Sequence, residues 1–271
     1  MKLGVRAHDI QAGITPSELK QKMDILGFDG LQLVFNKVFS KSIDEVDLLE
    51  IKKNFDKNIF LLGAYFNMVH PNLEEVNQGI INFKKHLDIA DSINAPFVGS
   101  ETGSLMGSPW GYMPMNHSDE SFLKVVKIVL ELVEYAKNMK VDVAIEGAYA
   151  HVIYSPKRMY QLLQAINHPK LKVILDLYNF LNIDNHEKHL DIFKEALDLY
   201  ADKIVIFHLK DYIVLDGKLV QVGLGKGLMK YHEIIELIKE KRPDSYLIFE
   251  GVKSEDLASS LKFISNIKGG N

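Results

Sequence analysis

The 271-residue sequence contains no cysteine. Without thiols, the chain can form neither a disulfide framework nor a thiolate zinc site. It also lacks an apolar run of membrane-spanning length, and no apolar segment typical of a signal peptide follows the N-terminal MKLGVRAHDI. We therefore expect a cytoplasmic protein without a membrane partner.

A strong charge of one sign is also missing. Lys and Arg total 32 and Asp and Glu total 36, so the formal net charge is −4, and no long basic run occurs. This balance does not favour nucleic acid as a partner. The hydrophobic fraction of 47% and the charged fraction of 25% are typical of a globular protein with a substantial core.

Strand-like and helix-like segments alternate along the whole chain. Strands are predicted at 3–8, 30–34, 59–67, 95–100, 143–146, 173–176, 204–208 and 247–250. Helices are predicted at 16–26, from a Ser42 cap to 55, and at 73–87, 118–139, 156–166, 187–200, 230–239 and 255–267. Thr15 and Glu18 form a capping-box pattern at the first helix, and Asn72 is the predicted cap of the third.

Eight strand–helix pairs in strict alternation predict a parallel sheet. A doubly wound sheet would carry a glycine-rich phosphate fingerprint after its first strand, but residues 8–13 read His-Asp-Ile-Gln-Ala-Gly. We therefore predict an α/β protein with one (β/α)8 TIM barrel domain spanning residues 1–271. The active sites of such barrels lie at the C-terminal ends of the strands.

Four consecutive predicted strands in the second half of the chain end on a side chain able to bind metal. These residues are Glu146, Asp176, His208 and Glu250. Three carboxylates and one imidazole suit one divalent ion, such as Mn²⁺, Mg²⁺ or Co²⁺, with Zn²⁺ as a further alternative. The residues alone leave two other interpretations open: ordinary polar strand ends, or an unmetallated carboxylate pair like that of glycoside hydrolases.

At these strand ends the chain resembles the xylose-isomerase-like TIM barrels, which include AP endonuclease family 2. The resemblance is carried by Ile145-Glu146-Gly147, Leu175-Asp176, His208-Leu209-Lys210-Asp211 and Phe249-Glu250-Gly251, and it covers essentially the whole chain. It implies an isomerase or epimerase of a sugar or sugar phosphate that uses one divalent metal, Mn²⁺ first. The implied metal ligands are Glu146, Asp176, His208 and Glu250, and the two glutamates would also be the catalytic acid and base.

The chemistry implied by this resemblance proceeds through an enediolate. A divalent ion stabilises the charge that develops when a proton leaves the carbon beside a carbonyl. Two carboxylates, here Glu146 and Glu250, can remove that proton and return one. Return to the opposite face of the same carbon is epimerisation, whereas return to the neighbouring carbon is aldose–ketose isomerisation.

One departure from the family pattern concerns Asn179. Many members carry a histidine three residues after the aspartate that corresponds to Asp176, and endonuclease IV needs it for a three-zinc site. Asn179 and the negative net charge therefore argue against a nuclease. Two alternatives to the isomerase remain: a metal-dependent dehydratase of a polyol ketone, resembling inosose dehydratase, and, less favoured, a phosphodiesterase of the endonuclease IV type.

Further candidates would contact a small sugar or polyol substrate. They are His70 at the end of the third predicted strand, Glu101 after the fourth, Trp110 in the loop that follows, Asn179 and Lys210. Each also has a plain structural interpretation. The glycine-rich segment 223–227 is expected to be either a turn or a phosphate loop. The sequence is compatible with a homo-oligomer.

Overall fold

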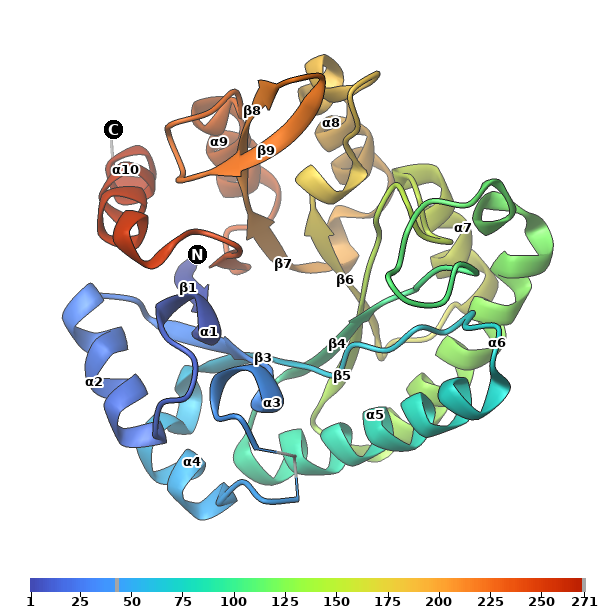
Figure 1. Cartoon of the computed structure of the whole chain (residues 1–271), viewed down its shortest axis with the longest axis horizontal. Helices are drawn as coiled ribbons and strands as arrows, with labels where there is room; N and C mark the ends of the chain where they lie inside the picture. The colour runs from blue at the N-terminus through green and yellow to red at the C-terminus, as the bar shows by residue number, and fades with distance from the viewer. Residues whose placement is uncertain (42–43, 270–271) are drawn as a thin grey trace.

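A computed structural model of the chain describes residues 1–41 and 44–269. Eight parallel strands close into a barrel in the order β1-β10-β7-β6-β5-β4-β3-β2 (Figure 1). They are β1 (Lys2–Arg6), β2 (Gly30–Leu33), β3 (Ile59–Gly63), β4 (Phe97–Glu101), β5 (Asp142–Glu146), β6 (Leu171–Asp176), β7 (Ile204–Leu209) and β10 (Tyr246–Phe249). The predicted (β/α)8 barrel is therefore confirmed.

A ring of helices surrounds the strands (Figure 1). It consists of α2 (Pro16–Leu26), α4 (Leu48–Phe55), α5 (Leu73–Ile93), α6 (Asp119–Tyr135), α7 (Pro156–Ile166), α8 (His189–Tyr200), α9 (Tyr231–Lys241) and α10 (Leu257–Gly269). Two short helices, α1 (Ala7–Ile10) and α3 (Phe35–Val38), follow β1 and β2 directly. Both bonds of the predicted capping box between Thr15 and Glu18 are present, and Asn72 caps α5 as predicted. None of the helices in the described part of the chain is long and apolar enough to cross a membrane.

Several predicted boundaries differ from the structure, among them the following three. The first strand ends at Arg6, and His8 lies in α1. Ser42 lies outside the described residues, and α4 begins at Leu48 because the Asp47 carboxylate caps the first turn. Strand β3 ends at Gly63 rather than at Asn67.

The early end of β3 has a local cause at Asn67. Its side-chain oxygen accepts the N–H groups of Val69 and Ser104, and its side-chain nitrogen donates to the carbonyls of Ser104 and Gly107. These bonds tie the segment after Gly63 to the loop after β4 rather than to a barrel strand. Asn67 therefore shapes a loop–loop contact at the C-terminal end of the barrel.

A hairpin that was not among the predicted elements lies between β7 and α9. Strands β8 (Asp211–Leu215) and β9 (Lys218–Val222) are antiparallel (Figure 1). They are joined by Asp216 and Gly217, whose φ angles are 49° and 70°. An Asp-Gly pair between two β-favouring runs is a strong hairpin signal, and it was available in the sequence.

Barrel strands alternate inward and outward side chains, and this alternation positions the polar residues. A buried apolar cluster contains Ala144, Ile174, Ile206 and Ile248. Each of these residues lies two positions before one of the four predicted metal ligands. Because side chains two apart on a strand share a face, the four ligands project on the same side as this apolar layer, one layer closer to the C-terminal ends.

Candidate metal centre

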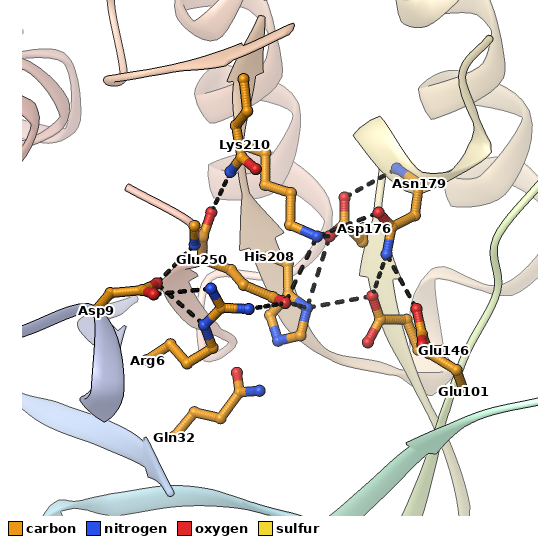
Figure 2. Close-up of polar contacts among 12 residues, drawn as sticks. Arg6, Asp9, Gln32, Glu101, Glu146, Asp176, Asn179, His208, Lys210 and Glu250 are labelled. Carbon is orange, nitrogen blue, oxygen red and sulfur yellow. Dashed lines mark hydrogen bonds and ion pairs between the residues drawn. The ribbon is translucent and has the colours of Figure 1, made fainter. Parts of the chain in front are cut away.

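The four residues predicted as ligands come together. Glu146, Asp176, His208 and Glu250 are buried, and each offers one ligand atom within 4.8 Å of the others. Asp176 and His208 are register partners on β6 and β7, and Figure 2 shows all four side chains converging. Strands β5, β6, β7 and β10 are consecutive in the closed barrel, so no loop has to fold over to bring them together.

The imidazole of His208 lies among the carboxylates. Its Nδ1 is 2.7 Å from Oε2 of Glu250, 3.4 Å from Oε1 of Glu146 and 3.8 Å from Oδ2 of Asp176. Burial by itself would lower the pKa of His208, but the charges of Glu250 and Glu146 raise it to about 10. Without a metal, the ring is therefore an imidazolium, and a bound cation would take the place of its proton.

Lys210 and Asn179 join the ligands into one network. The Lys210 ammonium lies 2.7 Å from Oδ2 of Asp176 and 3.6 Å from Oε1 of Glu250, and it donates to the Asn179 side-chain oxygen at 3.1 Å. The Asn179 side-chain nitrogen donates to Glu146 at 2.7 Å and to Glu101 at 3.4 Å. Three residues predicted to contact substrate thus lie beside the ligands, and two of them orient the ligand carboxylates.

Two residues of the centre, Arg6 and Asp9, were missed by the sequence analysis. Arg6 donates to Oε1 of Glu250 at 2.7 Å and, through Nε and Nη2, to both carboxylate oxygens of Asp9 at 3.1 and 2.7 Å. Asp9 also accepts the Gly251 N–H at 2.6 Å. Arg6 ends β1, but the first strand was predicted to end at residue 8, and an arginine is not a metal ligand, so the strand-end pattern did not select Arg6.

The carboxyl groups of the centre have different proton affinities. Burial, followed by the charge of Glu146, raises the pKa of Glu101 to about 8. Burial also raises the pKa of Glu146, although His208 opposes this effect. Burial would raise the pKa of Glu250 as well, but Lys210, His208 and Arg6 hold it well below its usual range. Glu250 is therefore the more firmly ionised of the two predicted catalytic glutamates.

The arrangement fits one divalent cation. Oδ2 of Asp176 and Oε2 of Glu250 are buried, yet neither accepts a hydrogen bond of normal geometry, although a nitrogen lies 2.7 Å from each. Buried polar atoms ordinarily have such a partner. Three carboxylates and one imidazole are also the donors that hard divalent ions prefer. Residues 1–41 and 44–269 contain a single group of this kind.

Comparison with family models identifies the barrel. The model of the xylose isomerase-like TIM barrel matches residues 22–267, which is most of the chain. The chain belongs to this family. The predicted resemblance to xylose-isomerase-like barrels is therefore confirmed. A search of curated protein sequences finds no significant match for this xylose isomerase-like barrel.

Solved structures share the fold along their full length. An IolI protein with a bound zinc atom superimposes with a TM-score of 0.78 at 16% identity, covering 99% of this chain and 98% of that one. A D-psicose 3-epimerase with D-fructose gives 0.75 at 18% identity, covering 100% of both chains. The 3-keto-D-glucoside 4-epimerase YcjR from E. coli gives 0.75 at 15% identity, covering 98% of this chain and 99% of that one. At these identities the similarity concerns the fold alone.

Two cavities adjoin residues of the metal centre in this xylose isomerase-like barrel. One, of about 570 Å³, is lined by Arg6, Tyr65 and Glu250 among others. The other, also about 570 Å³, is lined by Trp110 and Asn179 among others. Glu101 lines both cavities. Trp110 thus shares a cavity with Asn179, whose side chain hydrogen-bonds Glu146, and its contact with substrate stays a prediction.

His70 lies elsewhere. It belongs to the loop after β3, where its Nδ1 accepts the Asn72 N–H at 3.1 Å. It lines a separate cavity of about 330 Å³ together with residues of α5 and α6. Neither cavity at the metal centre is lined by His70, and its contact with substrate stays a prediction.

The glycine-rich segment after β9 wraps around a side chain of the chain itself. The N–H groups of Gly225 and Gly227 donate to Oδ2 of Asp211 at 2.9 and 3.0 Å. Those donors are consequently engaged by a carboxylate and do not form a vacant phosphate cradle. Of the two interpretations of residues 223–227, the structure favours the turn.

Proposed function

We propose that this protein is a divalent-metal-dependent enzyme that isomerises or epimerises a small sugar, a sugar phosphate or a related polyol ketone. The observation that carries the proposal is the buried convergence of Glu146, Asp176, His208 and Glu250 beside two cavities. The epimerases of D-psicose and of 3-keto-D-glucoside among the similar structures support a carbohydrate substrate.

The four convergent residues would hold one metal ion. Mn²⁺ is our first choice because of the oxygen-rich donors, with Mg²⁺, Co²⁺ and Zn²⁺ as alternatives. Zinc is the metal named for the similar IolI structure. When bound, such an ion supplies Lewis-acid stabilisation of the negative charge that develops on the substrate oxygens.

Glu146 and Glu250 would move the protons. They belong to the ends of β5 and β10, with β6 and β7 between them, so the two carboxyl groups flank His208 and Asp176. Glu250 is held ionised by its cationic neighbours and can therefore accept a proton, although its lowered pKa makes it the weaker base of the two. Glu146, whose pKa is raised by burial, binds a proton more readily, so the two glutamates together can remove one proton and return another. The face and the carbon that receive that proton decide between epimerisation and isomerisation.

The neighbouring polar residues would position the ligands and the substrate. Asn179 and Lys210 orient the ligand carboxylates through the bonds described above, and we assign both to substrate contact as well. Glu101 and Trp110 line the cavities and would contact substrate hydroxyls and an apolar ring face, respectively.

A dehydratase of a polyol ketone is the second candidate, because it would use the same four ligands. In that reaction one glutamate would take a proton, and the metal would assist the departure of a hydroxyl group. The two reactions differ in product mass, because the dehydratase product has lost one water. The phosphodiesterase alternative has less support: the described residues contain one ligand group, not three, and the net charge is −4. We propose no nucleic-acid partner.

Metal content tests the proposal first. We expect about one divalent ion per chain after incubation with Mn²⁺, measured by elemental analysis, and affinity reduced more than tenfold in Glu250→Gln and in His208→Ala. The matched controls are Glu255→Gln and His232→Ala, which change exposed residues and should retain the metal. Failure of wild type to bind any divalent ion would overturn the proposed mechanism.

A ketose panel in D₂O then tests the reaction. NMR should show deuterium incorporated from solvent at a carbon beside the carbonyl, in a product that otherwise conserves mass. Glu146→Gln and Glu250→Gln should each abolish this exchange. A product lighter by one water would identify the dehydratase instead.

A further inference from the structure

The two cavities that meet at Glu101 have different walls. The cavity beside Glu250 has a mixed lining, in which charged Arg6 and Lys37 alternate with apolar groups such as Phe35. The cavity beyond Asn179 is lined by Trp110, Tyr149, Tyr178, Leu219 and Ile183, and we call it the aromatic compartment. Apart from Glu101, its lining includes few charged side chains. A mixed cavity thus adjoins the centre at Glu250, and an aromatic one adjoins it at Asn179.

The rings of the aromatic compartment are held in place by their neighbours. Tyr149 stacks on Tyr112, with ring centroids 5.5 Å apart and planes inclined by 8°. The Tyr149 N–H donates to the Asn179 carbonyl at 2.7 Å, so this wall is tied to a residue that also binds Glu146. The Trp110 ring packs edge-on against buried His151 at 5.7 Å. The wall is therefore ordered before any ligand arrives.

Tyr178 connects the aromatic compartment to the metal centre. The Lys210 ammonium lies 5.9 Å from the centroid of the Tyr178 ring. The Tyr178 hydroxyl donates to the Leu219 carbonyl of β9 at 3.4 Å. The apolar wall accordingly begins beside Lys210 and continues outward to the hairpin. A molecule that occupies the metal centre can extend into this space without leaving protein contact.

We propose that the substrate is a glycoside, whose reacting sugar lies over the metal centre and whose second ring occupies the aromatic compartment. This inference rests on the proposed function, which requires that the reacting ring carry a carbonyl beside a hydroxyl. Each cavity has a volume of about 570 Å³, within the range of about 300–1,000 Å³ typical of small-molecule sites. A monosaccharide at the centre would leave the aromatic rings in contact with water. The flat face of an aryl or pyranose ring would cover them.

Trp110 makes the inference directly measurable, because it is the only tryptophan in the chain. The Mn²⁺-loaded protein is titrated with D-glucose, phenyl β-D-glucoside and cellobiose, and tryptophan fluorescence is followed. None of these probes carries a ring carbonyl, and NMR of the samples after the titration checks that the two reducing sugars, glucose and cellobiose, have not been converted. We expect at least one two-ring probe to bind about tenfold more tightly than glucose and to change the Trp110 emission. The phenyl and cellobiose titrations distinguish an aromatic second ring from a second sugar.

Variants locate the binding site. Tyr149→Ala should weaken the preferred two-ring probe about tenfold and leave glucose binding unchanged. Tyr160→Ala, which truncates a tyrosine on the outer helix α7, is the matched control and should change neither. Ile183→Arg places a charge at the exposed rim of the compartment, where folding is not at risk, and should reproduce the selective loss.

Two outcomes would overturn the inference. One is equal affinity for all three probes, and the other is a Tyr149→Ala variant that weakens all three alike. Metal content measured on the same samples separates this result from a failure of the proposed function. If the protein binds Mn²⁺ but does not prefer two-ring probes, the glycoside proposal is wrong and the proposed function stands. If it prefers two-ring probes but binds no metal, the proposed metal-dependent chemistry is wrong and the glycoside proposal stands.

Discussion

Arg6 shows at the scale of a single residue how one cation can serve two carboxylates. Its planar guanidinium faces Asp9 with two donors and Glu250 with a third. A lysine cannot reproduce this fork because its ammonium is a single point. Asp9 is in turn fixed by the Gly251 N–H, the residue immediately after Glu250. Arg6 and Asp9 therefore hold the start of the β10–α10 loop in register with β1.

Removing the guanidinium should separate its two effects. We expect Arg6→Met to lower the free energy of unfolding by about 2 kcal/mol, because Asp9 loses its cation in a largely buried position. The double variant Arg6→Met/Asp9→Asn should recover most of that loss. Metal affinity should fall about 10- to 100-fold in both variants, because Glu250 loses its orienting donor in each. Urea denaturation and metal titration measure the two quantities.

The control for this prediction is the ion pair between Lys84 and Glu131 on the outer helices, whose charged groups are 2.7 Å apart. The Lys84 side chain is partly exposed, and that of Glu131 is exposed. Lys84→Met should cost less than about 1 kcal/mol and leave metal affinity unchanged. Metal affinity that is unaffected in Arg6→Met would show that Glu250 needs no support from Arg6.

At the scale of elements, one carboxylate organises the β8–β9 hairpin and the turn that follows. Fully buried Asp211 accepts the N–H groups of Tyr212 and Met229 on Oδ1 and those of Gly225 and Gly227 on Oδ2. Gly227 must be glycine, because a Cβ there would lie 2.3 Å from the Asp211 carboxylate. This explains the glycine-rich sequence without a bound phosphate.

We expect Asp211→Asn to destabilise the protein by about 3 kcal/mol in urea denaturation, because the amide nitrogen cannot accept the N–H groups that the lost oxygen accepted. Asp216→Asn is the matched control at the exposed hairpin tip. Asn tolerates the positive φ of residue 216, so this change should cost less than about 0.5 kcal/mol. Equal stability of the two variants would contradict the role assigned to Asp211.

At the scale of the whole molecule, closure of the barrel couples stability to metal and to pH. In the metal-free protein the pKa of His208 is raised to about 10 from its ordinary 6.5, so its stabilising contribution is complete below pH 6.5 and is lost as the pH rises toward 10. Burial raises the pKa of Glu101 from 4.5 to about 8. The free energy of unfolding therefore falls as the pH rises from 4.5 through 8, because the buried carboxyl group must lose its proton. Both effects weaken the metal-free protein at high pH.

A bound cation should offset this loss. We expect Mn²⁺, at about 100 times the Kd measured near neutral pH, to raise Tm by about 5 °C at that pH. At the same Mn²⁺ concentration, the increase in Tm should be larger at pH 9 than at pH 6.5, because less His208 proton has to be displaced. Metal binding near pH 7.5 should release about one proton, mainly from His208. Calorimetry in buffers of different ionisation enthalpy measures the proton release. His208→Asn should show neither the release nor the pH-dependent increase, and an increase in Tm that is independent of pH would contradict the role of His208.

Much of the architecture followed from local patterns. Apolar runs ending in Glu146, Asp176, His208 and Glu250 predicted both the barrel strands and the convergence at their ends, because parallel strands of one barrel present their carboxyl ends together. The Thr15–Glu18 capping box predicted the start of α2 for a reason confined to one helical turn. The expected enzymatic chemistry came from the family resemblance and not from these local patterns.

The sequence by itself thus determined the elements, the barrel and the four predicted ligands, since each depends on periodicity or on residues near in the chain. Tertiary structure alone decided that Arg6 reaches Glu250, 244 positions away in the sequence. It also decided that His70 lines a separate cavity, and that Tyr149 and Tyr178 share a cavity with Trp110. Such contacts depend on barrel closure and on loop packing, which bring together side chains that no local pattern relates.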